Sequence, residues 1–323
     1  MAPAPPEFSI VLPAHNEAAN VAPMVAALKA ALPPQAAAEI IFVDDGSTDG
    51  TLAAVRAAAA ADPMIRYIAF TRNFGHEAAM RAGLRHARGR AVIVMDADFE
   101  HPPAVIAQLV DQWRKGFKVV AAQRKDDASV SHFKRATSRF YYRVLGALGD
   151  VQMEPGSADF LLLDRAVVEA INGFHDQDLF LRGLVRWLGY PIGKVDYQPG
   201  QRQHGASKYS VQRMVDLALT GIAAHSVRPL RAAIWLALGF ALLGVLFVVY
   251  SIVSFFLVER TVAGWTSIMA AIALLGAAQL FVVGIVGEYV GRILRETRRR
   301  PSYVVAETEA DRASSELRVA NRE

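Results

Sequence analysis

Two long stretches without a charged residue constrain this chain more than any other feature of its sequence. One runs from Ala232 to Leu257 and the other from Val262 to Gly287. Each is longer than the roughly 20 apolar residues that an α-helix needs to cross the hydrocarbon core of a membrane. Buried helices of a soluble domain are the alternative, but such domains rarely carry two runs of this kind in succession. We therefore expect two transmembrane helices joined by a short loop, Val258 to Thr261.

Arginine residues on the outer flanks of these stretches predict the topology. Arg228 and Arg231 precede the first stretch, and five arginines follow the second: Arg292, Arg295, Arg298, Arg299 and Arg300. Flanking positive charges favour the cytoplasmic side of a membrane, so both flanks are expected there. The sequence thus predicts a protein of the inner (cell) membrane that spans it twice, with its large N-terminal domain and its C-terminus in the cytoplasm.

The overall charge is modest, with a formal net charge of +4. The excess lies near the apolar stretches, where anionic headgroups or a lipid phosphate would be attracted. A nucleic-acid-binding protein would instead spread a basic patch over a domain. The expected partners therefore include a lipid bilayer and exclude nucleic acid, while a homo-oligomer is left open.

The N-terminal part alternates apolar strands with helices. The expected strands are Phe8–Leu12, Ile40–Val43, Ile65–Phe70, Ala91–Met95, Val119–Ala122 and Phe160–Leu163. The expected helices between and after them are Asn20–Leu32, Thr51–Ala61, Glu77–Ala87, Pro103–Lys115 and Arg165–Asn172. This alternation predicts an α/β domain with a mostly parallel, doubly wound sheet.

The composition along the chain divides it into five parts. We expect a disordered leader at residues 1–7, the α/β domain at 8–208 and an interfacial helix at 209–229. A transmembrane domain of two helices follows at 230–295. The polar tail at 296–323 is expected to lie in the cytosol and, from Pro301 onward, to be disordered or weakly docked.

Two of the expected strands end in paired carboxylates. Asp44 and Asp45 follow one apolar run, and Asp96 and Asp98 follow another. Parallel strands bring their carboxyl ends to the same edge of a sheet, where open α/β folds bind ligands. Either pair alone could serve only as turn or helix-capping residues. Two pairs on successive strands favour a crevice for a metal ion and a phosphorylated ligand.

The segment from Ser131 to Leu148 interleaves basic and aromatic residues. Its basic members are Lys134, Arg135, Arg139 and Arg143. The pattern suits a membrane surface, and a solvated charged face fits it equally well.

Five short motifs together resemble the signatures of family 2 glycosyltransferases. In chain order they are Leu12–Glu17, Asp44–Ser47, Arg72–His76, Asp96–Asp98 and Gly205–Tyr209. With paired C-terminal spans, the pattern is most similar to the polyprenyl-phosphate glycosyltransferases, the group of bactoprenol glucosyltransferases and dolichol-phosphate mannose synthases. The resemblance covers the chain from Phe8 to about Val305 and implies a GT-A fold, which is Rossmann-like with a mostly parallel sheet.

The resemblance also implies a reaction. It is the inverting, metal-dependent transfer of one sugar from a nucleotide-sugar donor, expected to be glucose from UDP-glucose, to a polyprenyl (undecaprenyl) phosphate at the cytoplasmic membrane face. The implied contacts to the donor come from Pro13, His15, Glu17, Val43, Asp45, Asp96, Ala97, Arg124, Arg202 and Lys208. Asp98, with Asp96, would bind Mg²⁺ or Mn²⁺, hard cations that prefer carboxylate and phosphate oxygens.

Several positions leave alternatives open. Glu100 stands where relatives often carry Gln, so it either joins the metal ligands or points to solvent. Asp159 matches the position usually assigned as the catalytic base. A phosphate monoester is largely ionised at neutral pH, however, so Asp159 could orient the acceptor or a sugar hydroxyl instead, or cap a turn. Lys134 and Arg135 could meet the acceptor phosphate or remain exposed cations.

Two other functions compete with this interpretation. A processive polysaccharide synthase shares the acidic motifs but carries Gln-x-x-Arg-Trp. Here Arg186 and Trp187 are present, while Gly183 stands in place of Gln. An inactive, membrane-anchored nucleotide-binding partner is disfavoured because the acidic and basic motif residues are all retained.

Overall fold

The computed structural model describes residues 5–33, 36–125, 157–174, 180–200, 228–257, 264–298 and 300–311. Within these residues the chain forms two compact units, one built on a sheet and one on a pair of long helices. Most of the expected interfacial helix and the loop between the apolar stretches lie outside the described residues.

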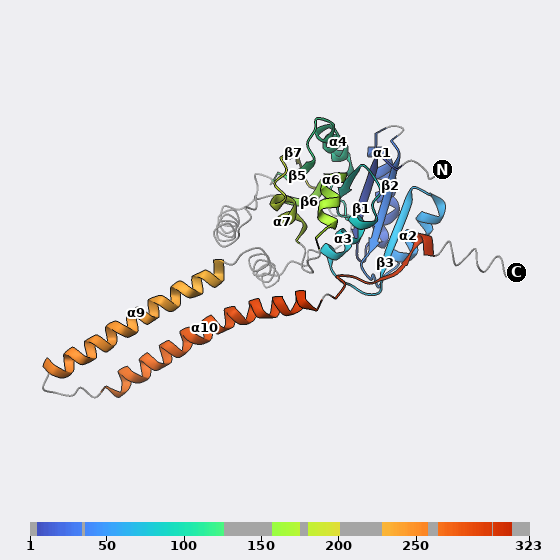
Figure 1. The fold of residues 1–323 in the computed structure, drawn as a ribbon. Helices are drawn as coiled ribbons and strands as arrows, with labels where there is room; N and C mark the ends of the chain where they lie inside the picture. The colour runs from blue at the N-terminus through green and yellow to red at the C-terminus, as the bar shows by residue number, and fades with distance from the viewer. Residues whose placement is uncertain are drawn as a thin grey trace. The chain divides into compact units, whose positions relative to one another are not determined.

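The first unit is built on an eight-stranded sheet with the order β7-β5-β6-β4-β1-β2-β3-β8 (Figure 1). The strands are β1 (Phe8–Ala14), β2 (Ala38–Asp44), β3 (Ile65–Phe70), β4 (Ala91–Val94), β5 (Val119–Arg124), β6 (Ser157–Asp164), β7 (Ile192–Tyr197) and β8 (Val305–Thr308). Strand β1 pairs in parallel with β2 and β4, as β2 does with β3 and β5 with β7. Strand β6 runs antiparallel between β4 and β5. The expected α/β fold with a mostly parallel sheet is confirmed.

Helices cover both faces of this sheet because consecutive strand residues point to opposite sides. On β1, Ile10 and Leu12 belong to one apolar core and Val11 to the other. The first core includes side chains of α1 (Ala18–Ala31), α2 (Thr51–Ala61) and α4 (Ile106–Arg114), which follows the short 3-10 helix η1 (Pro103–Val105). The second includes side chains of α3 (His76–His86), α6 (Arg165–Asn172) and α7 (Leu181–Trp187).

The segment after the apolar stretches returns to the sheet, in contrast to the expected disordered or weakly docked tail. Strand β8 pairs antiparallel with β3, and Tyr303 stacks on Phe70 with ring centroids 4.9 Å apart. Two ion pairs hold the same segment, since Arg56 lies 2.6 Å from Glu307 and Arg66 lies 2.6 Å from Glu309. The tail was hard to predict because β8 is short and polar, and because its partners lie more than 200 residues away in sequence.

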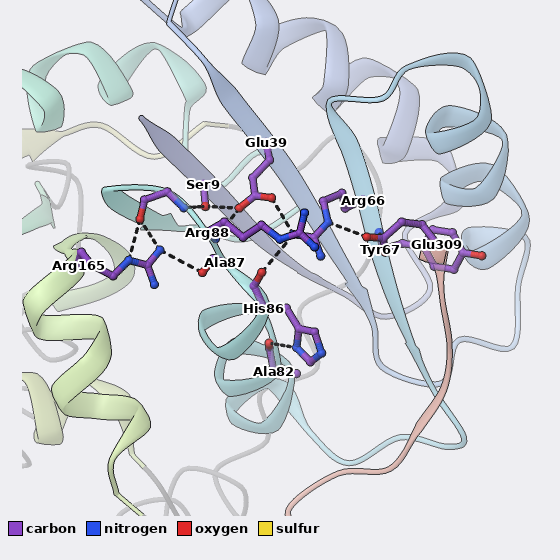
Figure 2. Close-up of polar contacts among 11 residues, drawn as sticks. Ser9, Glu39, Arg66, Tyr67, Ala82, His86, Ala87, Arg88, Arg165 and Glu309 are labelled. Carbon is purple, nitrogen blue, oxygen red and sulfur yellow. Dashed lines mark hydrogen bonds and ion pairs between the residues drawn. The ribbon is translucent and has the colours of Figure 1, made fainter. Parts of the chain in front are cut away.

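A buried polar network connects this tail to the middle of the sheet (Figure 2). Arg66 donates to Glu39 at 2.7 Å as well as to Glu309. The other oxygen of Glu39 accepts from the Ser9 hydroxyl and from the backbone N–H of Arg88, both at 2.6 Å. Burial of Glu39 is tolerated because its charge is paired and its oxygens accept hydrogen bonds.

The second unit contains the helices α9 (Arg228–Leu257) and α10 (Trp265–Thr297), which lie side by side in Figure 1. Within the described residues one helix, α10, is long and apolar enough to cross a membrane, over Leu274–Gly291. The apolar stretch found in α9, Ala237–Leu246, is shorter. The sequence predicts two spans and the structure supports one candidate, so the second span stays a prediction.

Candidate active site

The candidate site lies where the sheet reverses its strand order. The chain builds β1, β2 and β3 outward in one direction and then crosses to place β4 on the other side of β1. A crevice forms at such a switch point, outside the carboxyl ends of the strands. The chain leaves β1 at His15, β2 at Asp45 and β4 toward Asp96, so their loops meet at this edge.

Strand β6 adds a carboxylate from the opposite direction. Its antiparallel register pairs Ala91 with Asp164 and Val94 with Leu161. Continued beyond the end of β4, this register sets Asp159 opposite Asp96. The ring of His76 lies between them, with Nε2 3.4 Å from an oxygen of Asp96 and 3.8 Å from an oxygen of Asp159. The expected catalytic residue and the expected nucleotide contact are therefore neighbours.

Asp159 is buried and held by an arginine of α7. Arg182 Nε lies 2.5 Å from Oδ1, and a terminal nitrogen donates to Oδ2 at 2.7 Å. A second carboxyl, that of Glu77, is partly buried nearby. Burial and, to a lesser extent, the charge of Asp159 raise the pKa of Glu77 to about 7. The site therefore combines two close acidic groups with one guanidinium.

Asp45 holds the loop that precedes α3. Its Oδ1 accepts from the backbone N–H of Phe74 at 2.6 Å, and its Oδ2 accepts from that of Gly75 at 3.0 Å. Gly46 has φ +61°, and a Cβ there would lie 2.3 Å from the carbonyl carbon of Arg72. Only glycine allows the two loops to approach this closely. The neighbouring Asp44 is buried as well, and burial raises the pKa of its carboxyl.

Backbone and side-chain contacts join the loops after β1 and β2. His15 Nδ1 donates to the carbonyl oxygen of Asp45 at 2.8 Å. The backbone N–H of Asn16 donates to the Ser47 hydroxyl at 3.0 Å, and that of Glu17 donates to Thr51 Oγ1 at 2.7 Å. His15 itself is exposed at the edge of the sheet. Pro13 and Val43 are buried and paired in register behind these loops.

The loop after β4 carries the expected metal ligands. Ala97 and Asp98 are buried, and Asp98 accepts from the backbone N–H of Glu100 at 3.0 Å. Phe99 between them has φ +65°, a conformation that is costly for a bulky residue and concentrates at functional sites. Among the described residues, no three His, Asp or Glu side chains lie close enough together to hold a metal ion. The structure thus has no preformed three-carboxylate centre in this part of the chain.

The rings of His101 and Tyr197 contact each other beside this loop. The backbone N–H of Asp96 donates to His101 Nδ1 at 2.9 Å, and the His101 ring stacks on Phe160 at 5.1 Å between centroids. Because that ring nitrogen accepts, it is not available as a metal ligand in this arrangement. Burial raises the pKa of Tyr197 to about 12, with Arg124 opposing and the charges of Asp96 and Glu100 adding to the shift.

Comparison with known proteins assigns this arrangement to a family. The model of glycosyl transferase family 2 matches residues 9–171. The chain belongs to glycosyltransferase family 2. It is therefore an enzyme of that class, and a second model, the GtrB C-terminal hairpin, matches residues 228–293, which contain α9 and most of α10.

Individual relatives of this family 2 glycosyltransferase align over most of its length. A glycosyltransferase of Synechocystis described as uncharacterized is 36% identical over 93% of this chain and 95% of that protein. The bactoprenol glucosyl transferase of Shigella phage SfV is 36% identical over 83% of this chain and 87% of that protein. Among solved structures, a mannosyltransferase from Pyrobaculum calidifontis in complex with GDP-Man and Mn²⁺ is 18% identical, with a TM-score of 0.43, over 87% of this chain and 88% of that one.

Among the expected basic residues of the site, the structure describes only Arg124, which lies opposite Tyr197 in the register of β5 and β7. Arg124 ends β5 and is exposed. Lys134, Arg135, Arg202 and Lys208 lie outside the described residues.

The sequence motifs do not predict a role for three side chains at the site. His76 ends the motif Arg72–His76, and Glu77 begins the expected helix Glu77–Ala87. Arg182 had no motif at all. The ion pair between Asp159 and Arg182 could not be predicted, because many aspartates are followed by an arginine at a similar distance along a chain without contacting it.

Proposed function

We propose that this family 2 glycosyltransferase transfers a single sugar from a nucleotide-sugar donor to a polyprenyl phosphate. The observation that carries the proposal is the meeting of Asp96 and Asp159 at the switch point of the sheet, on either side of His76. The resemblance of this chain to family 2 glycosyltransferases implies a nucleotide-sugar donor. The chain also carries a segment that matches the GtrB C-terminal hairpin. A lipid-linked acceptor would explain why the catalytic domain is attached to an apolar helix pair.

The named relatives support a particular donor and acceptor. The bactoprenol glucosyl transferases of Shigella phages share 36% identity with this chain over 83% of its length. We therefore propose glucose, carried by UDP, as the transferred sugar and undecaprenyl phosphate as the acceptor.

The proposed reaction is one displacement at the anomeric carbon. An oxygen of the acceptor phosphate attacks C1, the bond from C1 to the donor diphosphate breaks, and the nucleoside diphosphate leaves with the electron pair. A single displacement inverts the configuration at C1. Because the second pKa of a phosphate monoester is about 6, the attacking oxygen is already ionised at neutral pH. Asp159 is thus needed to orient a substrate group more than to remove a proton.

A divalent ion, Mg²⁺ or Mn²⁺, is proposed to bind with the donor, through Asp98 and Asp96. Hard cations of this kind are commonly held by one or two carboxylates together with substrate phosphates. When bound, the ion would neutralise charge on the departing diphosphate. Titration calorimetry with Mn²⁺ tests this, because binding should be weak alone, strong with UDP, and lost in Asp98→Ala.

The membrane arrangement is proposed from the flanking arginines: α9 and α10 both cross the inner membrane, and the catalytic domain faces the cytoplasm. The chain contains no cysteine, so single cysteines can be labelled without background. An impermeant maleimide added to intact cells should label Glu259→Cys, between the helices, and should not label Lys115→Cys, an exposed position of the catalytic domain. The opposite pattern would refute the orientation.

A donor screen tests the function itself. The purified full-length protein is incubated with undecaprenyl phosphate and, in turn, with UDP-glucose, UDP-galactose, GDP-mannose or UDP-N-acetylglucosamine. We expect one sugar to be transferred from UDP-glucose. A lengthening polysaccharide would instead indicate a processive synthase, and nucleotide binding without turnover would indicate an inactive partner.

A further inference from the structure

The proposed reaction gives no role to the contact between Arg182 and Asp159. Arg182 Nε lies 2.5 Å from one oxygen of Asp159, and a terminal nitrogen donates to the other at 2.7 Å. The side chain of Asp159 is 10% exposed and that of Arg182 is 28% exposed. One hydrogen bond and one close ion pair from a planar guanidinium restrict the orientation of the carboxylate and balance its charge.

We infer that Arg182 is a positioning residue for transfer: it fixes the carboxylate of Asp159 and balances its charge so that an anionic acceptor can approach. The inference rests on the proposed function, because it assumes that the nucleophile is a phosphate. Asp159 remains the group placed against substrate, and Arg182 acts through it.

Contacts at the start of helix α7 fix the backbone position of Arg182. The backbone N–H of Leu181, the first residue of α7, donates to Glu77 Oε2 at 3.1 Å. The side chains of Leu181 and Val185 are buried in the core that α7 shares with α3 and α6. The next residue after this anchor is Arg182. Glu77 on α3 therefore holds the start of α7, and Arg182 on α7 contacts Asp159.

The negative charges at the site explain why Asp159 needs a positively charged partner. Asp159 and Asp96 both lie within 4 Å of His76, and Glu77 adjoins that histidine in the chain. A phosphate monoester brings a charge of about −1.5 to −2 at neutral pH. The carboxylates of the site and the acceptor phosphate would repel one another strongly, because the site is partly buried and water screens their charges only in part. A guanidinium on Asp159 lowers the repulsion that the acceptor meets, and it donates a hydrogen bond to one of the two carboxylate oxygens.

The inference differs from a purely structural ion pair in what it predicts for kinetics. A structural pair would lower the melting temperature and leave the turnover of the folded enzyme unchanged. A positioning residue would lower kcat while leaving the binding of UDP unchanged, and its effect would vanish once Asp159 is already lost.

The test uses the full-length protein in detergent with the donor and undecaprenyl phosphate. The variants are Arg182→Gln, Arg182→Lys, Asp159→Asn and the double variant Arg182→Gln/Asp159→Asn. The matched control is Arg114→Gln, which removes another arginine–carboxylate contact, 3.3 Å from Glu7, at the exposed surface. For each variant, kcat, the KM of both substrates, the Kd of UDP and the melting temperature are measured.

We expect Arg182→Gln to lower kcat by about 10- to 100-fold, as misplacement of a reacting group does. Arg182→Lys should recover part of this loss because it keeps the charge. The Kd of UDP should stay within about twofold of the wild-type value. The double variant should match Asp159→Asn within about twofold, because the effects of two residues that act through one contact do not add. Arg114→Gln should behave as the wild type.

Three results would overturn the inference while leaving the proposed function intact. These are wild-type kcat in Arg182→Gln at a temperature where it is folded, loss of UDP binding in that variant, or a further fall in kcat or rise in acceptor KM when Arg182→Gln is added to Asp159→Asn. A wild-type enzyme that transfers sugar to no polyprenyl phosphate would instead refute the proposed function, and the inference with it.

Discussion

The docking of the tail onto the sheet depends on Arg66, and its removal should be costly. Arg66 pairs with Glu39 at 2.7 Å, where the two side chains are 13% and 8% exposed, and with Glu309 at 2.6 Å, which is 24% exposed. Removing one partner of a buried pair costs about 3 to 5 kcal/mol, because it leaves an uncompensated charge. Since neither group is fully buried, we expect Arg66→Ala to destabilise the protein by about 3 kcal/mol, at the lower end of that range.

Thermal melting of the purified full-length protein measures this loss. For a domain of this size, 1 kcal/mol shifts the melting temperature by about 2 to 4 °C, so the expected fall is about 6 to 12 °C. Arg56→Ala is the control, because its pair with Glu307 has side chains 35% and 28% exposed. Such a pair contributes about 1 kcal/mol or less.

A second variant separates the uncompensated charge from lost packing. In a Glu39→Gln background no charge is left buried, so Arg66→Ala should cost clearly less than in the wild type. The reasoning fails if Arg66→Ala melts no earlier than Arg56→Ala, or if its cost is the same in both backgrounds.

Three further predictions concern the site and its supports. Because the pKa of Glu77 is raised to about 7 from 4.5, its protonated form stabilises the fold at low pH and this stabilisation is lost as pH rises through 7. Glu77→Gln should remove that fall in melting temperature, and an unchanged pH profile would contradict the assignment. Gly46→Ala, with φ +61° and a Cβ 2.3 Å from a backbone carbon, should weaken UDP binding measured by calorimetry; unchanged affinity would show that the loop can adjust. Tyr303→Ala removes the stacking on Phe70 and should lower the melting temperature by about 2 to 8 °C, from roughly 1 to 2 kcal/mol of lost aromatic contact and burial, whereas an unchanged melt would mean that β8 contributes little to stability.

Local sequence patterns were sufficient to predict the central strands and their helices. Apolar runs such as Ile40–Val43 and Ala91–Met95 lie within or within one residue of β2 and β4. These strands are buried on both faces, so continuous hydrophobicity marks them directly. Their terminal aspartates follow at the same edge of the sheet, as the alternation of strands and helices predicts.

The peripheral strands were not predicted because their stability is not local. Strand β7 alternates buried and exposed residues over Ile192–Tyr197, a pattern that could have been recognised. Strand β8 could not, since the ion pairs, backbone pairing and apolar contact that hold Val305–Thr308 are made with residues far away in the sequence. The pairing of Arg182 with Asp159 likewise depends on how α7 docks, which no single motif encodes.

The most direct test of the account is the mass of the lipid product. Purified enzyme is incubated with UDP-glucose, Mg²⁺ and undecaprenyl phosphate, and the lipid fraction is analysed by mass spectrometry while UDP release is followed in parallel. We expect undecaprenyl phosphate to gain the mass of one hexose residue, with one UDP released per lipid modified, and Asp98→Ala to abolish both signals. Unmodified lipid with every donor tested, or a ladder of products carrying many sugars, would contradict single-sugar transfer to a polyprenyl phosphate.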